Sequence, residues 1–152
     1  MIFELAVQSV LHSLIGIDAF IDEEQLHSKK KELCPRYPFN IPTPDFMLKN
    51  VTKLNGIDFA IRWVEVKMFY GAATLMHSGD NSIVGSILSK AERYVSLYGC
   101  GAFLFSFGCG IPLVESLLEL GVVVLEPSII PMEQMHLYQR SWCADSNGEI
   151  LP

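Results

Sequence analysis

One run of residues, IDFAIRWVEVKMF at positions 57–69, constrains the fold of this chain more than any other feature. It is rich in β-branched and aromatic residues, and it has apolar side chains at both odd and even positions, so it predicts a strand that is covered on both faces. A second strand is predicted at 45–49, and Asn55-Gly56 between the two is typical of a tight hairpin turn. The predicted centre of the fold is therefore an antiparallel hairpin within a larger sheet.

Other periodic patterns lie on both sides of this hairpin in the sequence. They predict helices and strands in this order: helices at 2–15 and 22–33, a helix that Asp80 or Asn81 caps and that ends at Tyr98, a strand at 102–107, a helix at 113–120 and a strand at 122–125. The second helix begins with a capping box from Asp22 to Gln25. We therefore expect one α/β domain at 1–131, a mixed sheet flanked by helices, followed by a C-terminal tail at 132–152.

Composition limits the classes of function. Half of the 152 residues are apolar, which suffices for one buried core, and the net charge of −6 excludes a protein that holds nucleic acid through bulk positive charge. Residues 95–114 carry no charge over a length that could cross a membrane, yet their paired glycines and Pro112 favour a buried strand between loops. The four cysteines lack the spacing of a disulfide framework or a zinc site, which indicates a reducing, intracellular compartment.

Charged residues inside the predicted central strand point to chemistry. Strand alternation places Glu65 and Lys67 on one face, and the offset through the hairpin turn can bring Asp45 beside Glu65. Two carboxylates form an oxygen site suited to Mg²⁺ or Mn²⁺, and an adjacent lysine can orient water and stabilise charge on a phosphate. These residues predict metal-assisted phosphodiester hydrolysis. The alternative is an exposed edge-strand ion pair between Lys67 and Glu65 or Asp45.

Several short motifs resemble those of one nuclease family. Thr43-Pro44-Asp45-Phe46, WVEVK at 63–67 and the following Gly71 resemble the TPD-motif nucleases of the PD-(D/E)xK, restriction-endonuclease-like superfamily. Further matches are FIDEEQL at 20–26, RYVSLYGCG at 93–101 and GVVVLEPSIIP at 121–131, so the resemblance covers about residues 2–131 in order. The resemblance implies a metal-dependent DNA nuclease with a restriction-endonuclease-like αβββαβ core.

The resemblance also implies roles for individual residues. Asp45 and Glu65 would be metal ligands, Val66 would give its backbone carbonyl to the metal, and Lys67 would be the catalytic lysine. Many superfamily members carry an acidic residue on the first helix, and Glu4 occupies that place here. The alternative for Glu4 is a solvated carboxylate on a helix face.

Basic residues supply the candidate substrate contacts. Lys90 stands where the family usually has a glutamine, and a lysine there could contact a phosphate. Lys31 and Arg36 belong to the only basic cluster and could touch a DNA backbone near the Asp45 loop; the alternative is a helix C-terminus stabilised by its dipole. His77 could approach the scissile phosphate, and the alternative is a surface histidine.

Two functions remain open at the level of sequence. The first is a divalent-metal-dependent endonuclease acting on DNA, and the second is a catalytically inactive nuclease-fold module that binds a partner protein or nucleic acid. Retention of Asp45, Glu65 and Lys67 favours the enzyme, whereas the acidic net charge and Lys90 favour the second function. The expected partner is DNA; a codanin-like protein and a homodimer are further options, and no membrane is expected. The expected location is the nucleus and cytoplasm of a eukaryote, or the cytoplasm of an archaeon.

Overall fold

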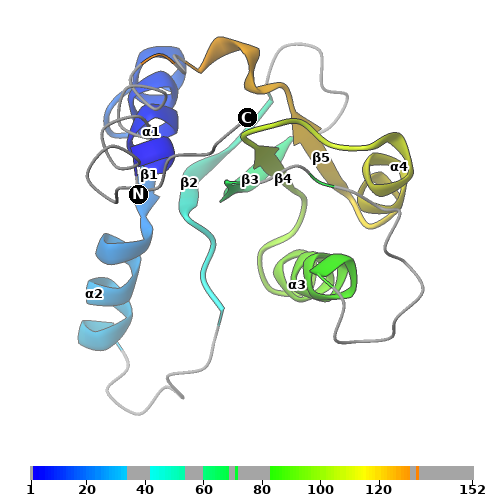
Figure 1. The fold of residues 1–152 in the computed structure, drawn as a ribbon. Coiled ribbons are helices and arrows are strands. Elements are labelled where there is room, and N and C mark those ends of the chain that lie inside the picture. The colour runs from blue at the N-terminus through cyan, green and yellow to red at the C-terminus, as the bar shows by residue number, and fades with distance from the viewer. Residues whose placement is uncertain are drawn as a thin grey trace, which may run out of the picture.

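Nine helices and strands build the described part of the chain, which comprises residues 2–33, 42–53, 60–68, 71, 83–130 and 133 of a computed structural model. Figure 1 shows their arrangement, and they follow one another as α1 (Ile2–Ile15), β1 (Phe20–Asp22), α2 (Glu23–Leu33), β2 (Phe46–Thr52), β3 (Ile61–Lys67), α3 (Ile83–Tyr98), β4 (Gly101–Phe105), α4 (Ile111–Glu119) and β5 (Val122–Leu125). A short 3₁₀ helix, Pro127–Ile129, follows β5. The predicted α/β class with a mixed sheet is confirmed.

The sheet has five strands in the order β1-β2-β3-β4-β5. Strands β1, β2 and β3 pair antiparallel, whereas β4 and β5 continue the sheet parallel to β3. The predicted antiparallel pairing of the hairpin strands is confirmed, and its turn at Asn55-Gly56 lies outside the described residues. The ion pair between Lys67 and Glu65, which the alternative interpretation expected, is present. Its expected place on an exposed edge strand is wrong, because β3 has a neighbouring strand on each side.

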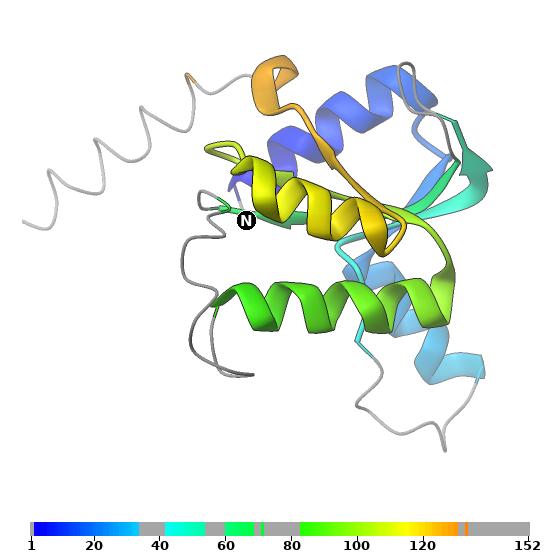
Figure 2. The same cartoon turned by 90° about the vertical axis from the view of Figure 1, so that its right-hand side faces the viewer.

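Helices cover both faces of the sheet, as Figures 1 and 2 show. On one face, Phe3 and Val7 of α1 join Val64 and Val66 of β3 in a buried cluster. On the other face, α3 and α4 pack around the buried Trp63 of the same strand. A strand with a helical layer on each side must be apolar on both faces, which explains the pattern of residues 57–69.

Strand β1 is not predicted from the sequence. It has three residues, too few to show alternation, and it ends where Asp22 caps α2 by accepting a hydrogen bond from the Gln25 N–H at 2.8 Å. Phe20 pairs with Leu48 of β2, and its ring packs edge-on against Phe46. Packing against β2 therefore specifies this strand, and local propensity does not. The Asp22 side of the predicted capping box is confirmed.

Several predicted bounds differ from the structure by a few residues. The predicted strands 45–49 and 57–69 are found at Phe46–Thr52 and Ile61–Lys67, with residues 57–59 and 69 outside the described residues. The predicted strand 102–107 ends at Phe105, because the next two residues form a turn. Of the predicted tail at 132–152, only Glu133 is described.

Residues 95–114, the uncharged stretch, form the end of α3, strand β4 and the start of α4. All five residues of β4 are buried, so the predicted buried strand is confirmed. Within the described residues, no helix combines the length and the apolar character needed to cross a membrane.

Gly101 lies so close to Trp63 that a methyl group at this position would overlap the indole ring. Trp63 is fully buried and donates its indole N–H to the Gly99 carbonyl at 2.8 Å, so the ring cannot move aside cheaply. We expect Gly101→Ala to lower the free energy of unfolding by about 3 kcal/mol, measured by urea denaturation. Trp63→Phe should cost less in the Gly101→Ala background than in the parent; additive losses would contradict the overlap.

Candidate active site

Asp45 and Glu65 face each other across the pair of strands β2 and β3. The register pairs Phe46 with Val64, so the residue before Phe46 stands opposite the residue after Val64. The Oδ2 atom of Asp45 accepts a hydrogen bond from the backbone N–H of Val66 at 2.6 Å. The structure thus brings together the two carboxylates that the sequence places on neighbouring strands.

Pro44 explains why the Val66 N–H bonds the side chain of Asp45 and not the backbone of β2. Continuing the register puts Pro44 opposite Val66. In a hydrogen-bonded antiparallel pair, the N–H and C=O of one residue point to the same neighbouring strand. Pro44 has no N–H to donate to the Val66 carbonyl, and the Asp45 carboxylate takes up the Val66 N–H. The Val66 carbonyl therefore points to the Asp45 side of the strand at a position where the β2 backbone offers it no donor.

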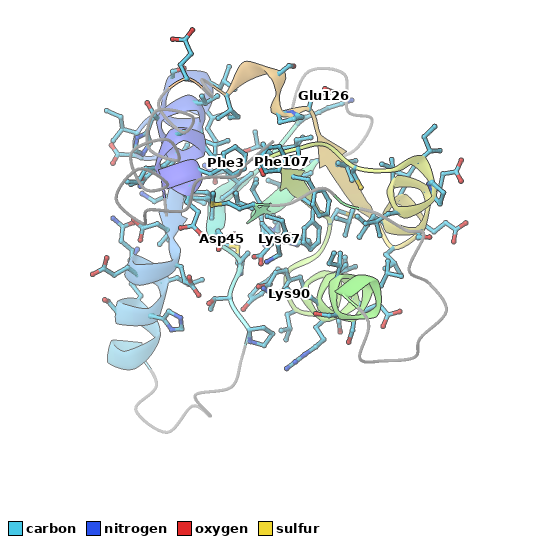
Figure 3. The ribbon with its side chains drawn as sticks, viewed as in Figure 1. Phe3, Asp45, Lys67, Lys90, Phe107 and Glu126 are labelled. Atoms are coloured by element: carbon cyan, nitrogen blue, oxygen red, sulfur yellow. The ribbon has the colours of Figure 1, made fainter. Side chains whose placement is uncertain are left out.

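Glu65 is almost fully buried, with 1% of its surface exposed. Its Oε1 atom accepts hydrogen bonds from Nζ of Lys67 at 2.6 Å and Nζ of Lys90 at 2.5 Å, and its Oε2 atom lies 3.2 Å from the hydroxyl of Tyr94. Figure 3 shows Lys67 and Lys90 next to Asp45 between the sheet and α3. A buried carboxylate without partners would cost several kcal/mol, and two ammonium groups offset that cost here.

Side chains of α3 hold the segment that leads into Asp45, which passes between α2 and α3 in Figure 1. The hydroxyl of Tyr94 donates to the Thr43 carbonyl at 2.6 Å, and the hydroxyl of Tyr98 donates to the Pro42 carbonyl at 2.9 Å. These bonds determine where the chain enters β2 and therefore where the Asp45 carboxylate lies.

Tyr94 is a site residue that sequence analysis misses. It lies one helical turn after Lys90, and this i, i+4 spacing is the signal that could have placed both on one face of α3. Its hydroxyl lies within hydrogen-bond distance of the Thr43 carbonyl and the Glu65 carboxylate. Tyr94 thus connects the segment before β2 to the acidic residue of β3.

Replacing Tyr94 with phenylalanine is expected to lower the free energy of unfolding by about 2 kcal/mol, because the buried Thr43 carbonyl loses its donor and the Glu65 carboxylate loses a polar neighbour. Tyr98→Phe is the matched control: it removes a hydroxyl one turn away, in a less buried place, and should cost about 1 kcal/mol. Chemical denaturation of both variants measures the difference. A loss for Tyr94→Phe that is no larger than that for Tyr98→Phe would argue against the connecting role.

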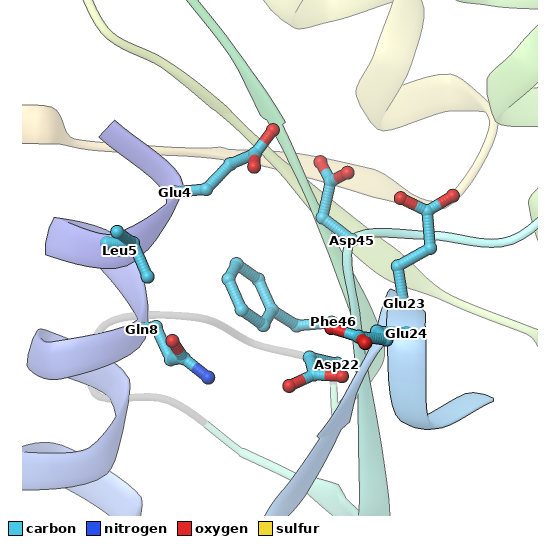
Figure 4. Close-up of a pocket in the computed structure, with 8 residues that line it drawn as sticks. All are labelled: Glu4, Leu5, Gln8, Asp22, Glu23, Glu24, Asp45 and Phe46. Carbon is cyan, nitrogen blue, oxygen red and sulfur yellow. The ribbon is translucent and has the colours of Figure 1, made fainter. Parts of the chain in front are cut away.

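A pocket of about 240 Å³ opens beside Asp45 on the side of α1. Its lining contains five carboxylates: Glu4, Asp22, Glu23, Glu24 and Asp45. Figure 4 shows the Glu4 side chain extending from α1 toward Asp45. Glu23 is tied to the segment before β2, since its Oε1 accepts a hydrogen bond from the Thr43 hydroxyl at 3.1 Å. The structure therefore places Glu4 in the lining of the same pocket as Asp45.

Burial and neighbouring charges shift the pKa values of three site residues. Burial, and then the charge of Glu65, raise the pKa of Asp45 to about 7, against the Val66 hydrogen bond and Lys67, which lower it. Burial alone would lower the pKa of Lys90, but its hydrogen bond and attraction to Glu65 outweigh burial and raise it. Burial and Glu65 also raise the pKa of Tyr94. At neutral pH Asp45 is therefore close to its ionisation midpoint, a common feature of functional sites.

The donors of this site suit a hydrated divalent cation. Asp45 and Glu65 offer carboxylate oxygens, the Val66 carbonyl points to the same side, and Glu4 adds negative charge nearby. In the described part of the chain, no three acidic, histidine or cysteine side chains converge closely enough to hold a metal by themselves. Mg²⁺ commonly binds one or two carboxylates and completes its shell with water and substrate phosphate, so the donor set fits Mg²⁺ or Mn²⁺.

The other predicted contacts have different outcomes. Lys67 is 21% exposed and Lys90 37% exposed, so both reach toward solvent from a buried partner. Lys90, predicted to contact a phosphate, is found on Glu65. The side chain of Lys31, and all of Arg36 and His77, lie outside the described residues, so these predictions stay predictions.

Comparisons with known proteins add no relative. No protein-family model matches the chain, and neither the curated proteins nor the solved structures gave a match. The chemistry of the site is therefore inferred from its own residues and their geometry.

Proposed function

We propose that this chain is a divalent-metal-dependent endonuclease that hydrolyses phosphodiester bonds of DNA. The observation that carries the proposal is the convergence of Asp45, Glu65 and Lys67 at the central strand pair, with the ammonium group 2.6 Å from the buried carboxylate. Apolar residues at the same positions would stabilise a core at least as well, because burying charges costs desolvation free energy. Charged groups kept in such a place are typical of functional sites.

A restriction-endonuclease-like fold is part of the proposal. The motif at Thr43–Asp45 resembles a superfamily whose core has the order αβββαβ. When α2 is set aside, this chain has the same order in α1, β1, β2, β3, α3 and β4. In this interpretation α2 is an insertion between the first two strands. The acidic residues then lie at the start of β2 and the end of β3, where the two central strands meet.

Each residue has a role that its position supports. Asp45, Glu65 and the Val66 carbonyl would hold a Mg²⁺ or Mn²⁺ ion, and Glu4 would add negative charge that attracts it. A bound ion would supply Lewis-acid stabilisation of a phosphate oxygen and a water of lowered pKa. Lys67, anchored on Glu65 and partly exposed, would hold the attacking water and neutralise charge that develops on the phosphate.

One observation favours a second function, namely binding without cleavage. Lys67 and Lys90 already donate hydrogen bonds to Oε1 of Glu65, and the Tyr94 hydroxyl lies 3.2 Å from Oε2. A nuclease-fold module that only binds DNA or a partner protein could keep this network as a structural feature. The two functions differ in whether a metal ion produces turnover, so one assay separates them.

The test is cleavage of a panel of linear duplex, single-stranded and branched DNAs, with RNA for comparison. We expect products with Mg²⁺ or Mn²⁺, none with EDTA, and recovery when excess metal is returned. Asp45→Asn replaces a carboxylate by an amide of similar size and gives the background rate. DNA binding without products at any metal concentration would contradict the enzyme and support the binding module.

A further inference from the structure

Lys90 forms an ion pair with Glu65, the carboxylate that would also hold the metal ion. Its Nζ lies 2.5 Å from Oε1, and Nζ of Lys67 lies 2.6 Å from the same atom. The Tyr94 hydroxyl lies 3.2 Å from the other oxygen, Oε2. Both ammonium groups that compensate Glu65 therefore lie on Oε1, and a cation that binds this oxygen must displace one of them.

Lys90 is the donor best able to leave. Its side chain is 37% exposed, against 21% for Lys67, and it comes from the surface helix α3. The Tyr94 hydroxyl is buried and also bonds the Thr43 carbonyl, so moving it would break a second contact. An ammonium group on a long, flexible stem can turn to solvent and regain its hydration, which a buried hydroxyl cannot.

We infer that Lys90 is a tethered counter-ion that competes with the divalent cation for Glu65. This inference rests on the proposed metal site and adds a positioning residue to it. In the metal-free protein Lys90 compensates the buried carboxylate, and metal binding displaces it from Oε1. Because both cations would bind the same carboxylate, each must weaken the binding of the other by the same factor.

The test is calorimetric titration of MnCl₂ into the parent protein and into Lys90→Gln and Lys90→Met. We expect both neutral variants to bind Mn²⁺ about tenfold more tightly than the parent, since a competing cation has been removed. Arg93→Gln is the matched control, because it removes the same charge from an exposed position of α3. Its dissociation constant should stay within about twofold of the parent value.

Thermal unfolding provides a second readout that needs no activity. Without metal, Lys90→Gln should melt at a lower temperature than the parent, because Glu65 loses a counter-ion. Added Mn²⁺ should raise the melting temperature of Lys90→Gln more than that of the parent. If Lys90 had only a structural role, Lys90→Gln would melt at a lower temperature without metal, but Mn²⁺ would raise the melting temperatures of variant and parent equally.

The outcomes separate this inference from the proposed function. If the parent binds Mn²⁺ and the neutral variants bind it equally or more weakly, the competition is wrong and the metal site stands. If Arg93→Gln tightens Mn²⁺ binding as much as Lys90→Gln does, the effect comes from the net charge of the protein, and the competition at Glu65 is again wrong. If none of the proteins binds Mn²⁺, both the metal site and the competition are wrong.

Discussion

Lys67→Ala is expected to lower metal-dependent DNA cleavage about 1,000-fold while Mn²⁺ binding is retained. The ammonium group is lost from its place beside Glu65, where it would hold the attacking water and neutralise charge on the phosphate. The carboxylates of Asp45 and Glu65, which would bind the metal, are unchanged. Single-turnover cleavage of a labelled DNA measures the first effect, and calorimetric titration of MnCl₂ measures the second.

Two features of the chain make this experiment well controlled. Glu65 keeps Lys90 as a counter-ion in the variant, so we expect the protein to fold, which circular dichroism checks. Lys49→Ala removes the same side chain from an exposed position of β2 and should cleave at the parent rate. Equal rates for Lys67→Ala and Lys49→Ala would remove Lys67 from the proposed chemistry.

The centre of the fold could be predicted because its signals are local in the sequence. The apolar pattern of β3 on both faces requires a covered central strand, and Glu65 and Lys67 break that pattern two residues apart. Asp45 lies at the start of β2, the strand predicted to pair with β3, so strand pairing alone brings it opposite Glu65. Strand register and the alternation of side chains are short-range rules. They are sufficient to predict that Asp45, Glu65 and Lys67 lie close together.

The contribution of α3 could not be predicted, because it depends on how the helix packs on the sheet. Lys90 lies 25 residues after Glu65, and no local pattern encodes their contact. The position of α3 is set by Trp63, whose ring packs edge-on against Tyr94 with centroids 5.0 Å apart. The same packing brings the Tyr94 hydroxyl to the Thr43 carbonyl. Contacts of this kind follow from tertiary packing, as does the short strand β1.

The pH dependence of stability is expected to reveal the unusual state of Asp45. Burial and the charge of Glu65 raise its pKa from 3.8 to about 7. Because the folded state then binds the proton more tightly than the unfolded state, this group contributes stability that is complete below pH 3.8 and lost as the pH rises through 7. Between pH 5 and pH 8, the metal-free parent should lose about 3 kcal/mol relative to Asp45→Asn, measured by urea denaturation. A parent and variant with parallel stability profiles would contradict the raised pKa.

Metal binding should show the opposite pH dependence, because a cation binds the ionised form of Asp45. We expect the affinity for Mg²⁺ to fall about tenfold for each pH unit below 7 and to level off above pH 8, with proton release that calorimetry in buffers of different ionisation enthalpy detects. Asp45→Asn should abolish this dependence, and equal parent affinities at pH 5 and pH 8 would exclude Asp45 as a ligand. Mg²⁺ should therefore restore at pH 8 the stability that ionising Asp45 removes, so one carboxylate would couple metal loading to folding.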